Sequence, residues 1–120
     1  MKKVLIVDDQ SDIRKLMRLT LGQRFELHEA ADASEAWELI RRQRPDAVIL
    51  DVMMPGEMDG YQLCERIKRD AAFSSTFVAL VTARGQAADR DRGKACGADD
   101  YFVKPFSPLD LMRRLDENLN

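Results

Sequence analysis

The sequence predicts an α/β protein in which a parallel β-sheet is covered by helices on both faces. Short apolar runs rich in valine and isoleucine, such as Lys3–Val7 and Ala47–Leu50, have the composition of strands buried on both sides. Segments whose apolar residues recur at helical spacing alternate with these runs. Such alternation of strands and helices is typical of a parallel sheet with helical connections.

The composition fits one folded domain. The chain has 120 residues, of which 45% are hydrophobic and 33% are charged. A net charge of -2 argues against nucleic acid as the main partner. The sequence has no apolar run near the roughly 20 residues of a membrane span, and no signal-peptide core. Cys64 and Cys96 lack metal-binding spacing, so we expect two reduced thiols in a cytoplasmic protein rather than a disulfide.

Helix start and stop signals separate the strands in the first half of the chain. Ser11 precedes a run of apolar residues at helical spacing, and Gly22 lies just past its end. Asp32 followed by Glu35 predicts a capping box that opens the next helix, which Pro45 ends. The strands predicted in this half are Lys3–Val7, Phe25–Ala30 and Ala47–Leu50.

The second half continues the alternation. We predict a helix at Tyr61–Arg69 and strands at Phe77–Val81 and Asp100–Val103. The helix between these strands, Ala87–Ala95, is very polar, so we expect it to pack weakly and to be more mobile than the others. Pro108 suits the first turn of a last helix.

Aspartates stand at the ends of two predicted strands. Asp8 and Asp9 follow the first strand, and Asp51 follows the third. A single aspartate there is usually a turn or capping residue. In a parallel sheet, however, the carboxyl ends of the strands meet at one edge, and close carboxylates repel one another unless a cation neutralises them. The three aspartates therefore predict a Mg²⁺ site, which such ligands suit.

Two further residues fall at the same predicted edge. Lys104 follows the fifth strand, where a lysine that is normally a solvated surface charge would face the carboxylates or a phosphoryl oxygen. Thr82 ends the fourth strand. Alone it is an ordinary strand residue, but at this edge its hydroxyl is a candidate donor to a phosphoryl group. Pro105 is a candidate for a cis bond.

Five motifs occur in order along the predicted strands: VLIVDD (Val4–Asp9), LDVMMPG (Leu50–Gly56), MDG (Met58–Gly60), VTA (Val81–Ala83) and GADDYFVKPF (Gly97–Phe106). With these motifs, essentially the whole chain resembles the receiver domain of bacterial two-component response regulators. Each motif alone is a weak signal, but five in register are specific. The resemblance implies a flavodoxin-like, doubly wound (βα)5 fold over residues 1–120, with strand order 2-1-3-4-5.

The resemblance also implies a chemical role for the acidic residues. Asp51 matches the aspartate that accepts a phosphoryl group from a sensor histidine kinase or phosphotransfer protein. Asp8 and Asp9 match the acidic pair that binds Mg²⁺ together with Asp51 and the backbone carbonyl of Met53. Aspartate is a competent nucleophile for such a transfer, and it gives an acyl phosphate that water can attack. We expect the side chains of Met53 and Arg84 to border that water.

The remaining roles concern the switch. Lys104 matches the lysine that contacts the phosphoryl group, Thr82 matches the switch hydroxyl, and Tyr101 matches an aromatic whose ring turns inward on activation. The face made by Ala87–Ala95, Asp100–Val103 and the last helix would then repack to control a downstream effector domain or partner. The resemblance makes a homodimer through this face a further expectation. The sequence leaves open the cognate kinase, the output, and whether the chain is a whole regulator or part of a longer one.

One departure from the family pattern is Glu57, an apparent insertion between Gly56 and Met58. A longer surface loop is the simpler interpretation, and altered kinase docking or added negative charge near the metal is the alternative. Two other functions fit the sequence less well. An aspartyl-phosphate phosphatase is disfavoured because Met53 stands where such enzymes have a second aspartate. A receiver that only docks proteins is disfavoured because Asp8, Asp9, Asp51, Thr82 and Lys104 are all present.

Overall fold

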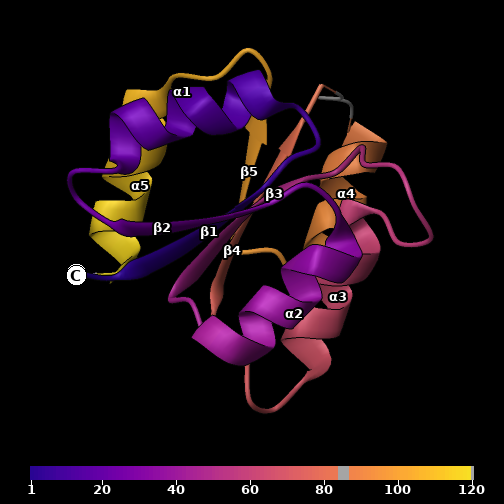
Figure 1. Cartoon of the computed structure of the whole chain (residues 1–120). Coiled ribbons are helices and arrows are strands. Elements are labelled where there is room, and N and C mark those ends of the chain that lie inside the picture. Colours follow the sequence, from indigo (N-terminus) through magenta and orange to yellow (C-terminus); the bar gives the residue numbers. More distant parts are fainter. Residues whose placement is uncertain (84–86, 120) are drawn as a thin grey trace.

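The computed structural model describes residues 1–83 and 87–119, and it forms a five-stranded sheet with five helices (Figure 1). The strands are all parallel, in the order β2-β1-β3-β4-β5. The predicted flavodoxin-like, doubly wound fold is therefore confirmed. The elements are β1 (Lys3–Val7), α1 (Ser11–Leu21), β2 (Glu26–Ala30), α2 (Ala33–Gln43), β3 (Ala47–Asp51), α3 (Gly60–Arg69), β4 (Phe77–Thr82), α4 (Ala87–Ala95), β5 (Asp100–Val103) and α5 (Pro108–Leu119).

Two hydrophobic layers hold the helices on opposite faces of the sheet. Figure 1 shows α1 and α5 on one face, and α2, α3 and α4 on the other. Side chains alternate along each strand, so Val4 and Ile6 pack in the layer under α1 and α5, whereas Leu5 and Val48 pack in the layer under α2 and α3. Because both faces are covered, β1, β3 and β4 are apolar nearly throughout, as the sequence predicted, whereas the edge strand β2 carries Glu26, His28 and Glu29.

The strand ends differ from the prediction by one residue. β3 extends to Asp51 and β4 extends to Thr82, each one residue beyond the predicted bounds of Ala47–Leu50 and Phe77–Val81. β2 begins at Glu26 rather than at Phe25, whose buried side chain joins the core. Strand ends that carry polar residues are hard to place from hydrophobicity alone, because the pairing partner decides where the ladder stops.

The helix starts follow the predicted capping chemistry only in part: α1 begins at Ser11 without a side-chain cap, and half of the capping box predicted for α2 forms. The Asp32 carboxylate accepts a hydrogen bond from the Glu35 N–H at 2.8 Å, as expected for the residue before α2. A full reciprocal capping box occurs at α3 instead, between Asp59 and Gln62. Asp59 thereby fixes where the loop after Asp51 ends and α3 begins.

The polar character of α4 has the predicted structural consequence. Within Ala87–Ala95, all of which is described, Gly93 is the one buried residue. By contrast, α2 buries Ala33, Ala36 and Ile40. A helix with so little buried apolar surface gains little free energy from packing, so it opens more easily than its neighbours.

We therefore predict that backbone amides in α4 exchange with solvent deuterons at least about tenfold faster than those in α2, because local opening needs less free energy there. Hydrogen exchange followed by mass spectrometry on peptides that cover each helix measures this. Equal protection of α2 and α4 would contradict the prediction.

Candidate functional site

Four strands deliver polar side chains to one edge of the sheet. Asp8 follows β1, Asp51 ends β3, Thr82 ends β4 and Lys104 follows β5. The parallel register places these ends side by side: Val7 pairs with Leu50, Asp51 with Val81, and Thr82 with Val103. The sequence prediction that separate strands bring these residues to one edge is confirmed as a matter of geometry.

The three aspartates form a compact acidic cluster. Each of Asp8, Asp9 and Asp51 offers a carboxylate oxygen, and these oxygens lie within 4.8 Å of one another. Asp8 and Asp51 are buried, with 3% and 5% of their surface exposed, while Asp9 is exposed. Oxygen ligands at this spacing suit a hard divalent cation such as Mg²⁺. The open side at Asp9 gives such an ion access to water.

Lys104 neutralises part of this charge. Its Nζ lies 3.4 Å from Oδ2 of Asp8 and 3.7 Å from Oδ2 of Asp51. The Lys104–Pro105 peptide bond, which follows β5 directly, is cis. At these distances from both carboxylates, the ammonium group can attract the oxygens of an anion bound at Asp51.

The environment of Asp51 raises the pKa of its carboxyl group from 3.8 to about 6. Burial is the main cause, because it disfavours the charged form. The hydrogen bond from the Met53 N–H, at 3.1 Å to Oδ1, acts in the opposite direction, and the negative charge of Asp8 raises the pKa further. Asp51 is therefore mostly ionised at neutral pH, but its charge is held at a cost in free energy that a cation would relieve.

The predicted switch residues, Thr82 and Tyr101, lie on β4 and β5. Thr82 is fully buried at the end of β4. Tyr101, on β5, lies partly buried against the layer that contains α3, and its hydroxyl is 3.5 Å from that of Tyr61. The side chain of Met53 is half exposed next to the cluster. Arg84, the other residue expected to border the site, lies outside the described residues.

Residues 4–116 match the sequence model of the response regulator receiver domain. The chain belongs to this family. Among similar proteins, the probable transcriptional regulator ycf27 of Guillardia theta is 45% identical over 115 residues, which cover 95% of this chain and 44% of that protein. SrrA of Staphylococcus aureus, a transcriptional regulatory protein, is 40% identical over 114 residues, which cover 94% of this chain and 46% of that protein. The chain thus spans less than half the length of these curated relatives.

Solved receiver structures share the whole fold. The Vibrio cholerae chemotaxis protein CheY4 superimposes with a TM-score of 0.91, at 34% identity, over 98% of both chains. The receiver domain of DrrB, in its BeF3-activated form, superimposes with a TM-score of 0.90, at 31% identity, over 99% of this chain and 97% of that one. The receiver domain is a signalling domain, and this chain has its complete architecture.

The loop after Asp51 carries Glu57, the apparent insertion in the sequence. Glu57 is exposed and lines a groove of about 480 Å³ together with Asp9, Met58 and the start of α2. Glu57 thus lies on the surface, at the border of the acidic cluster. This placement agrees with a longer surface loop and also brings the charge of Glu57 to the groove that Asp9 lines.

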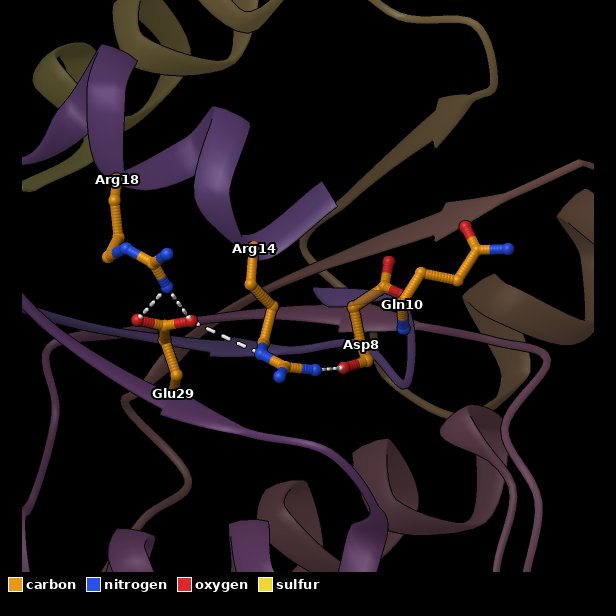
Figure 2. Close-up of polar contacts among 5 residues, drawn as sticks. All are labelled: Asp8, Gln10, Arg14, Arg18 and Glu29. Atoms are coloured by element: carbon orange, nitrogen blue, oxygen red, sulfur yellow. Dashed lines mark hydrogen bonds and ion pairs between the residues drawn. The ribbon is translucent and has the colours of Figure 1, made fainter. Parts of the chain in front are cut away.

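A network of hydrogen bonds that the sequence did not reveal holds the backbone of Asp8 in place. Figure 2 shows Arg14, on α1, reaching β2 and the end of β1. Its Nη1 donates to the Asp8 carbonyl at 2.6 Å, and its Nε donates to Glu29 at 3.1 Å. Glu29 also accepts two hydrogen bonds from Arg18, at 2.5 and 2.6 Å. The network ties α1 to β2 and fixes the backbone that carries the Asp8 carboxylate.

We predict that Arg14→Ala lowers the free energy of unfolding by about 1–3 kcal/mol, because it removes a charge-assisted bond from the Asp8 carbonyl and a partner from Glu29. It should also weaken the affinity of the acidic cluster for Mg²⁺ several-fold. Urea denaturation and a Mg²⁺ titration measure the two effects.

Arg18→Ala is the matched control. Arg18 binds the same Glu29, but its side chain is half exposed and its hydrogen bonds run to Glu29 rather than to Asp8. Its loss should cost less than about 1 kcal/mol and leave Mg²⁺ affinity unchanged. Equal effects of the two substitutions would show that the contact with Asp8 does not matter.

Within residues 1–83 and 87–119, no helix has the length and apolar character needed to cross a membrane. Both cysteines of the receiver domain are free and buried, in line with the expectation of reduced thiols.

Proposed function

We propose that Asp51 accepts a phosphoryl group from a sensor histidine kinase or phosphotransfer protein, and that the charge added there switches the α4-β5-α5 face. The observation that carries this proposal is the acidic cluster of Asp8, Asp9 and Asp51 facing Lys104 at one sheet edge, in a chain of the receiver family. The domain comprises residues 1–120.

Transfer requires an ionised nucleophile and neutralised phosphoryl oxygens. A carboxylate oxygen of Asp51 attacks phosphorus, the bond from phosphorus to the donor nitrogen breaks, and an acyl phosphate forms. Asp51 is mostly ionised above pH 6, as its raised pKa requires. Lys104 draws the phosphoryl oxygens, and the Thr82 hydroxyl donates to one of them once it has moved toward the site.

The acidic cluster fits a resident Mg²⁺. Asp8, Asp9 and Asp51 would hold it with their carboxylates, and Met53 with its backbone carbonyl. When bound, Mg²⁺ supplies positive charge that offsets the negative charge on the carboxylates and the phosphoryl group. Water attack on the acyl phosphate ends the signal, so the domain promotes its own phosphorylation and dephosphorylation and acts on no other substrate. The half-exposed Met53 side chain borders the path of that water.

The conformational readout passes through Thr82 and Tyr101. Tyr101 already contacts the α3 and α4 side of the sheet, so phosphorylation would stabilise its inward position rather than create it. The α4-β5-α5 face carries the ion pair between Asp100 and Arg114, at 3.0 Å, and such charges could also join two copies in a homodimer.

The output acts on an effector domain or a partner protein. Relatives more than twice as long as this chain are described as transcriptional regulators, which supports an effector domain of that kind in a longer protein. The net charge of -2 supports the view that the receiver domain itself does not bind nucleic acid. We place the domain in the cytoplasm, away from membranes, where reduced thiols and a kinase partner are both expected.

Treatment with acetyl phosphate, with and without Mg²⁺, followed by intact mass measurement, tests the proposal. We expect one added phosphate that requires Mg²⁺ and is absent in Asp51→Asn. The control Asp91→Asn, an exposed aspartate on α4, should behave as the wild type. If the folded protein gains no phosphate, binding of beryllofluoride with Mg²⁺ separates rapid hydrolysis from an inactive site. No binding would overturn the proposal.

A further inference from the structure

The ring of Tyr101 lies unusually close to the backbone of α4. A Cβ atom placed on Gly93 would lie 3.0 Å from Cδ2 and 3.2 Å from Cε2 of Tyr101. Glycine within a helix costs roughly 1 kcal/mol relative to alanine, so its presence in the middle of α4 needs a reason. The close approach of the ring supplies one, because a hydrogen atom at this position leaves room for Tyr101 where a methyl group would press against the ring.

The polar end of the ring meets a second tyrosine. Tyr61, in the first turn of α3, is 5% exposed and donates from its hydroxyl to the backbone carbonyl of Asp89 at 3.3 Å. That donation leaves the Tyr61 oxygen as the acceptor for Tyr101, whose hydroxyl lies 3.5 Å away. Burial raises the pKa of the Tyr61 hydroxyl, so Tyr61 keeps its proton at physiological pH and can donate it to the Asp89 carbonyl.

Two arginines of α4 lie over the rings of the two tyrosines. The guanidinium carbon of Arg92 lies 4.4 Å from the ring centre of Tyr61, and that of Arg90 lies 5.4 Å from the ring centre of Tyr101. These are cation–π distances. Tyr61 and Tyr101 are therefore held together by α4, the least packed helix of the fold, so the position of Tyr101 and the position of α4 depend on each other.

We propose that Gly93 and Tyr61 form the seat that holds Tyr101 inward, and that they thereby set how readily the domain adopts its phosphorylated conformation. Gly93 provides the space for the ring, and Tyr61 provides the polar contact at its end. Both act as positioning residues. The proposal rests on the proposed function in one respect, the use of Tyr101 as the switch aromatic.

A ligand that favours the inward position binds more weakly when that position is less populated in the free protein. Gly93→Ala pushes against the ring, and Tyr61→Phe removes the hydroxyl contact while it keeps the aromatic packing. Because a neutral hydrogen bond has a modest net effect, Tyr61→Phe should weaken beryllofluoride binding about two- to tenfold, and Gly93→Ala should weaken it by more.

The chain contains two tyrosines, so ring-labelled ¹³C-tyrosine gives separate NMR signals for Tyr61 and Tyr101. In the metal-free protein, Gly93→Ala should move the Tyr101 signals toward those of a solvent-exposed tyrosine. Tyr61→Phe leaves Tyr101 as the one labelled ring and should move its signals in the same direction. Lys94→Ala, at an exposed neighbouring position of α4, is the control and should leave them in place.

The metal-free spectra test the seat without reference to phosphorylation. Unchanged Tyr101 signals in the folded variants would show that Gly93 and Tyr61 do not hold the ring. If Gly93→Ala does not fold, Tyr61→Phe alone provides this test. Beryllofluoride titration in excess Mg²⁺ then tests the coupling. If the wild type does not bind beryllofluoride, the proposed function is refuted, but the Tyr101 signals still show whether Gly93 and Tyr61 hold the ring. A wild type that binds, with variants that bind equally well, would overturn the coupling.

Discussion

Replacing Asp51 by asparagine is expected to raise the free energy of unfolding of the metal-free protein by about 1–3 kcal/mol at pH 7.5. Burial raises the pKa of this carboxyl group from 3.8 to about 6, so the folded protein binds a proton that the unfolded chain releases. Asparagine removes the cost of holding that buried charge. It keeps an acceptor for the Met53 N–H, and Lys104 keeps Asp8 as a partner.

The stability that Asp51→Asn gains over the wild type should increase as the pH rises. Below about pH 4, Asp51 is protonated in both the folded and the unfolded protein, and the substitution changes little. Between 3.8 and about 6 the unfolded chain ionises first, so the wild type loses the stability that its raised pKa supplied at low pH. The advantage of Asp51→Asn therefore grows through this range and levels off above it.

Urea denaturation of wild type and Asp51→Asn in EDTA, at pH 4, 5, 6 and 7.5, measures this difference. Asp91→Asn, an exposed substitution, should give no gain at any pH. Added Mg²⁺ should narrow the difference, because a cation bound to the folded wild type stabilises it by mass action. A gain that stays constant with pH would mean that the charge of Asp51 is not its source.

The sequence predicted the fold and the edge that carries the site because both follow from local patterns. Buried parallel strands read as apolar runs, and the residue that ends each run lies at the same edge by topology. The sequence alone therefore predicted that Asp8, Asp51 and Lys104 lie close together. The predicted strand bounds were off by one residue at the end of β3, at the end of β4 and at the start of β2.

Contacts between side chains distant in the sequence could not be predicted in this way. Arg14 reads as one more polar residue on a surface helix, yet it binds the Asp8 carbonyl and Glu29. Tyr61 reads as an apolar helix residue, yet its hydroxyl meets that of Tyr101 across 40 positions of the chain. Hydrophobic periodicity fixes which face a residue occupies, but partner choice depends on distances of a few ångström between packed elements.

Gly60→Ala is expected to lower the free energy of unfolding by about 2–4 kcal/mol, because position 60 has no room for a side chain. Gly60 is buried at the start of α3, and its N–H donates to the Val52 carbonyl at 3.1 Å. A Cβ atom there would lie 2.4 Å from the Asp51 carbonyl oxygen and 2.6 Å from the Val52 Cα. Both obstacles are backbone atoms, so the overlap can be relieved only by moving α3 or the end of β3.

Because the end of β3 carries Asp51, we expect Gly60→Ala to reduce phosphorylation by acetyl phosphate as well as stability. Gly56→Ala is the matched control in the same loop. Its Cβ would meet nothing within 4 Å, but its φ of 108° disfavours any side chain, which costs roughly 1–2 kcal/mol in backbone conformation. Urea denaturation should therefore rank Gly60→Ala as the more damaging change. Should the two substitutions prove equally costly, the close packing of α3 against Asp51 would not be what requires glycine at position 60.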